Sequence, residues 1–177
     1  MQNVEYKAEL RDLPLARTIA GSIGALRADT LRQTDTYFRI PDGKLKRRET
    51  IGHPTEWVAY ARPDFSRAKL STFTIYPEHM ARERFGAAAL PVWTVVKKTR
   101  ELWTYQGVRI HLDTVENLGT FIEFEALICP ERTQAKAHEL VESLRASFAP
   151  AMGEAIAVGY ADLLMNEPAA ADNPETR

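Results

Sequence analysis

The sequence predicts an α+β protein whose strands are mostly antiparallel. Three observations lead to this class: about eight short segments alternate apolar and polar residues, a few segments have helical spacing, and no Gly/Ser-rich linker divides the chain. The length of 177 residues and the hydrophobic fraction of 45% suit one compact domain with a real core. We expect that single domain over residues 1–165, followed by a polar, Pro-containing and disordered tail over residues 166–177.

The predicted strands are the segments in which apolar and polar side chains alternate. In chain order they are Val4–Leu10, Gln33–Ile40, Lys44–Glu49, Glu56–Arg62, Leu70–Tyr76, Val92–Arg100, Val108–Thr114 and Thr120–Ile128. Asp42-Gly43 and Asn117-Leu118-Gly119 are turn signals between neighbouring strands. So many antiparallel strands must either leave exposed edges or close into a barrel.

The predicted helices carry apolar residues on one stripe. Leu13–Leu26 follows Asp12, an N-cap candidate, and has Pro14 in its first turn. Thr133–Phe148 has the same helical spacing. The two weaker helical segments are Pro77–Ala89 and Tyr160–Met165. Such amphipathic helices need an apolar surface to cover, and one face of the predicted sheet offers it.

The composition excludes several classes of protein. With 23 Lys and Arg against 24 Asp and Glu, the formal net charge of −1 argues against a general nucleic-acid binder. The single cysteine, Cys129, excludes an intrachain disulfide and a cysteine-based zinc site. No run of apolar residues is long enough for a membrane span, and the first residues do not resemble a signal peptide. We therefore expect a cytoplasmic protein without a membrane partner.

The polar faces of the strands are rich in Arg, Lys and Glu, and the charges occur in same-sign clusters. Glu123 and Glu125 share one face of their strand, as do Lys46 and Arg48 on another. An ordinary half-buried sheet with a solvated outer face would also produce this alternation. If the helices cover the apolar face and the sheet closes, however, the charged face lines a lumen. A dry lumen of that kind is too costly unless its charges bind something.

The charges on these faces are compatible with a polyanionic guest. The seven bases are Lys7, Lys46, Arg48, Arg62, Lys98, Arg100 and Arg109. The four acids are Glu5, Asp113, Glu123 and Glu125. The bases exceed the acids by three charges, or by five with a divalent cation on the acids. A triphosphate carries about four negative charges, and cationic clamps with a metal ion are the usual means of stabilising phosphoryl transfer.

In their order along the chain, these segments resemble the CYTH family, the triphosphate tunnel metalloenzymes, and within it the class IV adenylyl cyclase-like branch. The segments that carry the resemblance are Asn3–Lys7, Gln33–Phe38, Leu45–Glu49, Tyr60–Pro63, Lys98–Arg100, Val108–Asp113, Leu118–Glu125 and Tyr160–Leu164. The resemblance implies a closed eight-stranded antiparallel β-barrel, or tunnel, with helices packed outside. It also implies a triphosphate or nucleoside triphosphate substrate and Mg²⁺ or Mn²⁺ as cofactor.

The resemblance assigns roles to the charged residues. The implied metal ligands are Glu5, Glu123 and Glu125, with Asp113 as a candidate fourth acid. The implied phosphate contacts are Lys7, Lys46, Arg48, Arg62, Lys98, Arg100 and Arg109. The family's signature strand reads Glu-x-Glu-x-Lys, and Asn3 replaces the first of its glutamates. Asn3 offers an oxygen without charge, so a second metal ion would bind more weakly.

Two enzymatic reactions and one binding function fit these residues. In an adenylyl cyclase, the ribose 3′-hydroxyl attacks the α-phosphorus and pyrophosphate leaves. In a triphosphatase acting on tripolyphosphate, thiamine triphosphate or a nucleoside triphosphate, water attacks a terminal phosphorus. The tunnel residues do not separate these reactions. The alternative is a non-catalytic sensor of nucleotide or polyphosphate, which Asn3 favours; either form could be a monomer or a homodimer.

Overall fold

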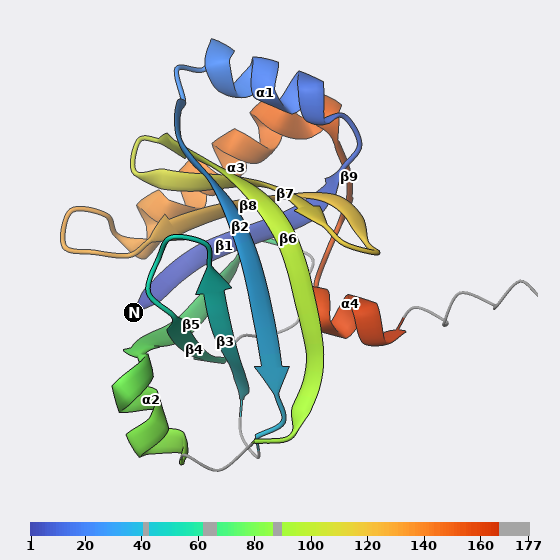
Figure 1. The fold of residues 1–177 in the computed structure, drawn as a ribbon. Helices are drawn as coiled ribbons and strands as arrows, with labels where there is room; N and C mark the ends of the chain where they lie inside the picture. Colours follow the sequence, from blue (N-terminus) through green and yellow to red (C-terminus); the bar gives the residue numbers. More distant parts are fainter. Residues whose placement is uncertain (41–42, 62–66, 87–89, 167–177) are drawn as a thin grey trace, which may run out of the picture.

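The computed structural model describes residues 1–40, 43–61, 67–86 and 90–166 (Figure 1). Some predictions fall on residues outside this part of the chain. They are the phosphate contact Arg62, the turn residue Asp42 and nearly all of the predicted tail, residues 167–177. Asn166, which the sequence analysis placed in the tail, is the last residue of the final helix.

Within the described residues the sheet has nine strands. They are β1 (Gln2–Leu10), β2 (Leu26–Phe38), β3 (Lys44–Thr50), β4 (Glu56–Ala61), β5 (Lys69–Pro77), β6 (Val92–Tyr105), β7 (Val108–Val115), β8 (Gly119–Leu127) and β9 (Met152–Ala155). Neighbours follow the order β5-β4-β3-β2-β6-β7-β8-β1, and β5 pairs again with β1. This last pairing closes eight antiparallel strands into the predicted barrel, while β9 adds to β1 outside the ring.

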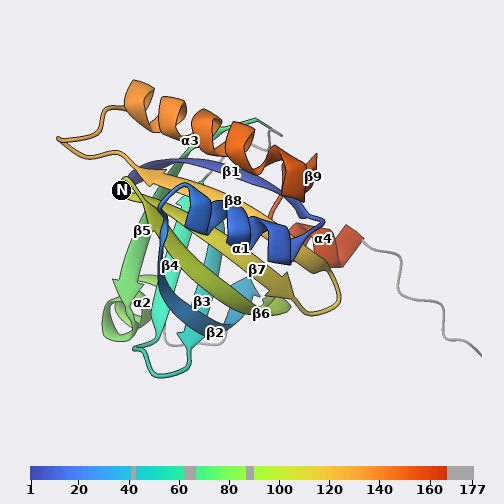
Figure 2. The same cartoon turned by 90° about the horizontal axis from the view of Figure 1, so that it is seen from above.

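Helices pack on the outside of the barrel (Figure 2). They are α1 (Leu13–Ser22), α2 (Glu78–Phe85), α3 (Gln134–Phe148) and α4 (Tyr160–Asn166). Asp12 caps α1 as predicted, since its carboxylate accepts a hydrogen bond of 2.8 Å from the Leu15 amide. None of the helices in the described ranges has the length and apolar character that a membrane span requires.

The main hydrophobic core lies between the barrel wall and the outer helices. Val4 and Tyr6 of β1 and Phe124 of β8 pack with Leu144 and Phe148 of α3, all nearly or fully buried. Because side chains alternate along a strand, burying these residues on the outer face turns their charged neighbours toward the barrel axis. Because the helices cover the apolar outer face, the charged side chains of these strands lie inside the barrel.

Four elements differ from the sequence-based prediction. The first helix ends at Ser22 rather than Leu26, because Gly24 adopts a left-handed conformation (φ +81°) that terminates it. The second strand begins at Leu26 instead of Gln33, since its polar first half pairs with β6. β6 itself continues beyond Arg100 to Tyr105, and the short β9 was not predicted. For the three strands, pairing supplies order that the local residue pattern does not indicate.

The packing of α3 on the barrel predicts a large effect of one substitution. Phe148→Ala should lower the free energy of unfolding by about 3–5 kcal/mol, because it opens a cavity at a fully buried aromatic side chain. Urea denaturation followed by circular dichroism measures this change. Ser147→Ala, at the neighbouring exposed position, is the matched control and should alter stability by less than about 0.5 kcal/mol. Equal effects of the two variants would contradict this description of the core.

Candidate active site

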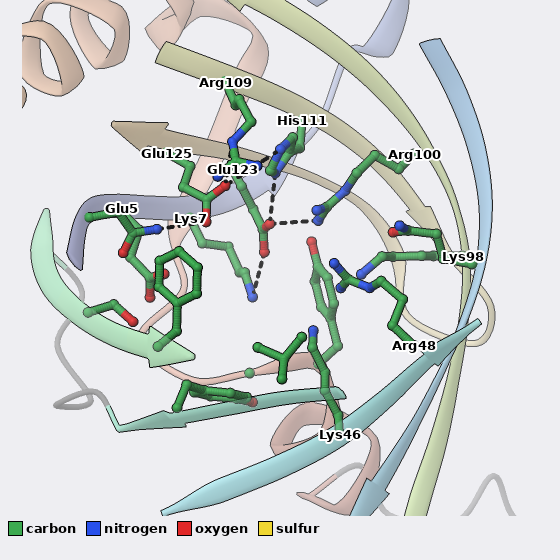
Figure 3. A pocket seen from close by; sticks show the side chains of 18 of the residues that line it. Glu5, Lys7, Lys46, Arg48, Lys98, Arg100, Arg109, His111, Glu123 and Glu125 are labelled. Carbon is green, nitrogen blue, oxygen red and sulfur yellow. Dashed lines mark hydrogen bonds and ion pairs between the residues drawn. The ribbon is translucent and has the colours of Figure 1, made fainter. Parts of the chain in front are cut away.

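A cavity of about 310 Å³ lies inside the barrel, and charged side chains from facing strands converge on it (Figure 3). Among the described residues that line it, the six bases are Lys7, Lys46, Arg48, Lys98, Arg100 and Arg109. The four acids are Glu5, Glu56, Glu123 and Glu125. The structure thus brings together all the sequence-predicted site residues that it describes except Asp113, and it adds Glu56.

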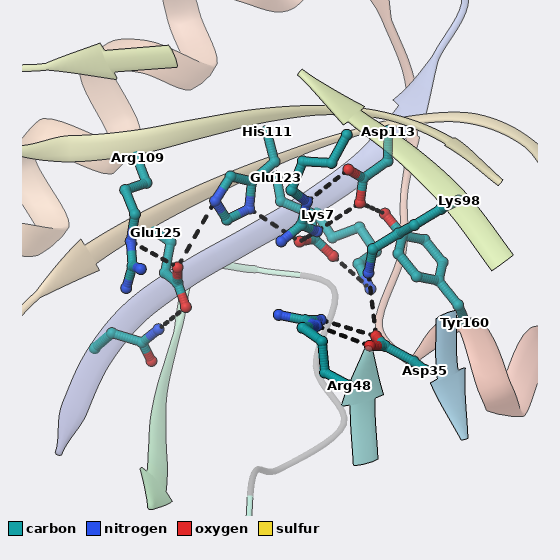
Figure 4. A network of polar contacts seen from close by, with 12 residues as sticks. Lys7, Asp35, Arg48, Lys98, Arg109, His111, Asp113, Glu123, Glu125 and Tyr160 are labelled. Atoms are coloured by element: carbon teal, nitrogen blue, oxygen red, sulfur yellow. Dashed lines mark hydrogen bonds and ion pairs between the residues drawn. The ribbon is translucent and has the colours of Figure 1, made fainter. Parts of the chain in front are cut away.

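The acids at one wall of the cavity come from β1 and β8, and their partners follow from strand register. Glu123 lies opposite Lys7 on β1 and opposite His111 on β7. Its carboxylate is 2.9 Å from Lys7 Nζ, 2.7 Å from Arg100 Nη2 and 3.3 Å from His111 Nδ1 (Figure 4). Burial alone would raise the pKa of Glu123, but Lys7 and Arg100 outweigh it and hold that pKa well below its usual range.

The second acid of β8, Glu125, is paired with different groups. It lies opposite Glu5 on β1 and Arg109 on β7. Asn3 Nδ2 donates a hydrogen bond of 2.6 Å to Glu125 Oε1, and Arg109 Nε lies 3.1 Å from Glu125 Oε2. The Arg109 side chain is 44% exposed, far more than the other cations whose contacts are described here.

Asp35 organises the opposite wall, and the sequence analysis did not single it out. It is fully buried and accepts hydrogen bonds from Arg48 Nε at 2.7 Å, Lys46 Nζ at 2.9 Å and Lys98 Nζ at 3.3 Å. Burial favours its neutral form, yet the three cations hold the pKa of Asp35 well below its usual range. The sequence contained one indication of this role: Asp35 alternates with Gln33 and Tyr37, so that all three lie on the inward face of β2.

The two lysines beside Asp35 differ from the arginines in how firmly they hold their charge. Burial and the Arg48 guanidinium lower the pKa of Lys46 to about 7, against the opposing effect of Asp35. Burial likewise lowers the pKa of Lys98 to about 8. The pKa values of Arg48 and Arg100 are raised, because Asp35 and Asp113 respectively outweigh their desolvation. The arginines are therefore permanent charges, whereas the lysines titrate near neutral pH.

Asp113 is on the inward face of β7 with Arg109 and His111 but does not line the cavity, because its oxygens are already used. It is 1% exposed, and its oxygens lie 2.7 Å from Arg100 Nε and 2.5 Å from Arg100 Nη2. The Tyr160 hydroxyl donates a further hydrogen bond of 2.9 Å to it. Arg100 holds the pKa of Asp113 below its ordinary value, although burial acts in the other direction. This geometry makes Asp113 the residue that orients Arg100.

The segment leading into α4 covers one end of the cavity. Gly159 and Tyr160 line it, and the Tyr160 ring centroid is 3.9 Å from Lys7 Nζ and 5.3 Å from Lys98 Nζ. Lys69 Nζ donates a hydrogen bond of 2.5 Å to the carbonyl oxygen of Ala157. The sequence analysis expected only a final helical turn here, because nothing in the residue pattern places it against the barrel end.

The oxygen atoms at the acidic wall are of the type that a hard divalent cation prefers. Among the described residues, no three His, Cys, Asp or Glu side chains already form a group that could hold a metal ion. Asn3 Oδ1, however, is buried at the cavity wall and has no hydrogen-bond partner, while its Nδ2 is fixed by Glu125. Side-chain oxygens for a divalent cation are thus available on the adjacent strands β1 and β8, from Asn3, Glu5 and Glu125. These oxygens fit such a cation if Glu125 releases Arg109 and binds the cation instead.

Comparison with solved structures finds the same fold in several organisms. A conserved protein from Pyrococcus furiosus has a TM-score of 0.71 and 17% identity, covering 91% of this chain and 99% of its own. A Vibrio parahaemolyticus protein named as a candidate adenylate cyclase has a TM-score of 0.69 and 18% identity, covering 92% and 97%. A candidate adenylyl cyclase from Hippeastrum, described as having a dominant triphosphatase activity, has a TM-score of 0.61 and 15% identity, covering 92% and 95%.

The similarity to these structures concerns the fold, since each identity is below 25%. No curated protein matches the chain in sequence. The family model of the CYTH domain, in contrast, matches residues 1–160 and so includes the whole barrel and the Tyr160 position. The closed barrel, its charged interior and this match lead to one conclusion: the chain belongs to the CYTH domain family.

Proposed function

We propose that this protein is a metal-dependent enzyme that acts on a triphosphate, either as an adenylyl cyclase or as a triphosphatase. The observation that carries the proposal is the interior of the barrel, where six cations on facing walls meet a cluster of acids in one cavity. The names of the Vibrio and Hippeastrum neighbours support both activities. The monomeric or homodimeric state and the cytoplasmic location stay predictions from the sequence.

The cations would bind the phosphate chain. Arg48 and Arg100 are permanently charged and held in place by buried carboxylates, so their remaining N–H groups can donate to phosphate oxygens. Lys7, Lys46 and Lys98 add point charges, and we keep Arg62 and Arg109 in the same role. Because these cations are already fixed in position, they stabilise charge that develops on the phosphate oxygens during the reaction.

The acidic wall would hold the Mg²⁺ or Mn²⁺ ion. We propose Glu5, Glu123 and Glu125 as ligands, joined by the unpartnered oxygen of Asn3. Such an ion supplies Lewis-acid stabilisation of phosphate oxygens when it is bound. Because Asn3 carries no charge, the wall offers one negative charge fewer than the family's signature strand. Asp113 completes the site by keeping Arg100 oriented rather than by contacting the ion.

A non-catalytic sensor is the second candidate, and one observation favours it. Glu123 is paired with Lys7 and Arg100, and Glu125 with Arg109, so a metal ion must compete with bases for both. Incubating the protein with Mn²⁺ and ATP, tripolyphosphate or thiamine triphosphate, followed by chromatography, separates the candidates. Cyclic AMP with pyrophosphate identifies a cyclase, orthophosphate identifies a triphosphatase, and tight binding without product identifies the sensor.

Replacement of one acid tests the metal assignment. Glu123→Gln should lower Mn²⁺-dependent turnover by about 10²–10³-fold, because the isosteric amide keeps the shape of the wall but removes its charge. Product formation measured by chromatography, with circular dichroism as a check of folding, gives the result. Glu139→Gln, on the exposed face of α3, is the matched control and should keep full activity. Unchanged turnover in the Glu123→Gln protein would remove this residue from the site.

The lowered pKa of Lys46 predicts how phosphate binding depends on pH. With a pKa of about 7, Lys46 is mostly neutral at pH 8, and a bound polyanion favours its charged form. Tripolyphosphate binding without metal should therefore take up protons, and its affinity should fall as the pH rises from 7 to 9. Isothermal titration calorimetry in buffers of different ionisation heat measures both effects.

Lys46→Arg is the control for this pH dependence, because arginine stays charged over the whole range. In that variant proton uptake should decrease, and the loss of affinity between pH 7 and 9 should become smaller. Lys98, with its pKa of about 8, accounts for the dependence that is left. An affinity that rises with pH in the wild-type protein would contradict the assignment of Lys46 to the phosphates.

A further inference from the structure

One histidine lies inside the barrel, and its two ring nitrogens point to different carboxylates. His111 is on the inward face of β7, is 4% exposed, and is the only histidine among the described residues that line the cavity. Its Nδ1 lies 3.3 Å from Glu123 Oε2, and its Nε2 lies 3.9 Å from Glu125 Oε2 (Figure 4). The imidazole thus lies between the two acids of β8.

The protonation of His111 leaves a lone pair on the nitrogen that faces Glu125. Burial and the Arg100 guanidinium lower the pKa of His111, so the ring is neutral at pH 7 and carries one N–H. Because only Nδ1 is within hydrogen-bond distance of a carboxylate, the N–H is on Nδ1 and donates to Glu123. Nε2 is then an acceptor without a hydrogen bond to any described residue, and the oxygen that it faces is also an acceptor. A cation between them would satisfy both atoms.

This arrangement is typical of histidines that bind metal ions. A metal-binding imidazole usually donates its other N–H to a carboxylate, which fixes its tautomer and its orientation. A divalent ion such as Zn²⁺ binds imidazole nitrogen and carboxylate oxygen at about 2.0–2.2 Å, so that two ligands of one ion lie about 3–4.3 Å apart. The separation of 3.9 Å between His111 Nε2 and Glu125 Oε2 is within this range.

A second acceptor beside the same carboxylate also lacks a partner. Asn3 is 1% exposed, and its Nδ2 is bound to Glu125 Oε1, while its Oδ1 has no hydrogen-bond partner. Buried polar atoms without a partner are rare in proteins and call for an explanation. Arg109, which is 3.1 Å from Glu125 Oε2, is 44% exposed and can therefore move away without being left buried. A cation at Glu125 would then have unpartnered acceptors from two neighbouring side chains.

We propose that Nε2 of His111 is a ligand of the divalent ion, next to Glu125, an inference that rests on the proposed function. Glu123 orients the imidazole through Oε2, and its Oε1 is available to the ion once Lys7 leaves. Imidazole is a favoured ligand of first-row transition metals, whereas Mg²⁺ prefers oxygen ligands. The mixed nitrogen and oxygen site therefore selects Mn²⁺, and the ions that exceed it in affinity for nitrogen sites, over Mg²⁺.

The nitrogen ligand can be detected directly on bound Mn²⁺. Electron spin echo envelope modulation of the wild-type protein with Mn²⁺, recorded with and without tripolyphosphate, should show coupling to a directly bound nitrogen. Isothermal titration calorimetry should give an affinity for Mn²⁺ about tenfold or more above that for Mg²⁺. Binding of Mn²⁺ without nitrogen coupling would overturn the inference, while the proposed function stands. If Mn²⁺ binds under neither condition, the proposed function fails as well.

One replacement separates a metal ligand from a residue that only orients Glu123. His111→Asn places an amide N–H near the position of Nδ1 but no atom at the position of Nε2. Nitrogen coupling should therefore disappear, and Mn²⁺ affinity should fall about tenfold or more, since even the loss of a group that orients a ligand costs about 10–100-fold. Wild-type Mn²⁺ affinity in this variant would mean that His111 only orients Glu123, against the proposal. His79→Asn, at an exposed position of α2, is the matched control and should keep both the coupling and the affinity.

Discussion

The mutual neutralisation of buried charges is the constraint on which the rest of this structure depends. Moving an ionised side chain out of water costs several kcal/mol unless a partner of opposite charge and hydrogen bonds compensate it. Inside the barrel Asp35 compensates three cations, Asp113 compensates Arg100, and Glu123 compensates Lys7. Closure of the sheet brings these partners together from strands far apart in the sequence. The network then holds the cations in fixed positions before any guest arrives.

The same constraint explains why the hydrophobic core is outside the barrel. The interior of an eight-stranded barrel is either filled by side chains or left open for one small ligand. Here α3 covers the outer faces of β1 and β8, where Phe124 and Phe148 are fully buried. Stability therefore comes from the helix-covered exterior, and the interior is available for chemistry. A barrel stabilised by its own interior could not also keep a polar cavity of about 310 Å³.

The pairing inside the cavity also suggests how a metal ion and a triphosphate would depend on each other. Lys7 and Arg109 can bind phosphate fully only when they release Glu123 and Glu125, and these carboxylates can bind a cation only when they release their bases. A guest that brings both charges replaces both sets of contacts at once. Arg109, the exposed partner of Glu125, is the side chain best placed to make that exchange. Lys46 and Lys98 add a protonation step, because their charge depends on what lies beside them.

The residue pattern alone determined the α+β class, most of the strand positions, and the set of charged residues that share one face, since alternation is a local property. The order of charged segments also identified the family resemblance, which the match of the CYTH family model to residues 1–160 then confirmed. The pattern could not determine how far pairing with neighbouring strands extends the sheet, so the strand over Leu26–Arg32 and β9 became visible only in the structure. Asp35 and Asp113 show the same limit within the site. Both are acids on inward faces. The closed barrel places three cations around Asp35 and places Asp113 beside Arg100. The sequence does not show these contacts, because the partners lie on different strands that become neighbours only in the folded sheet.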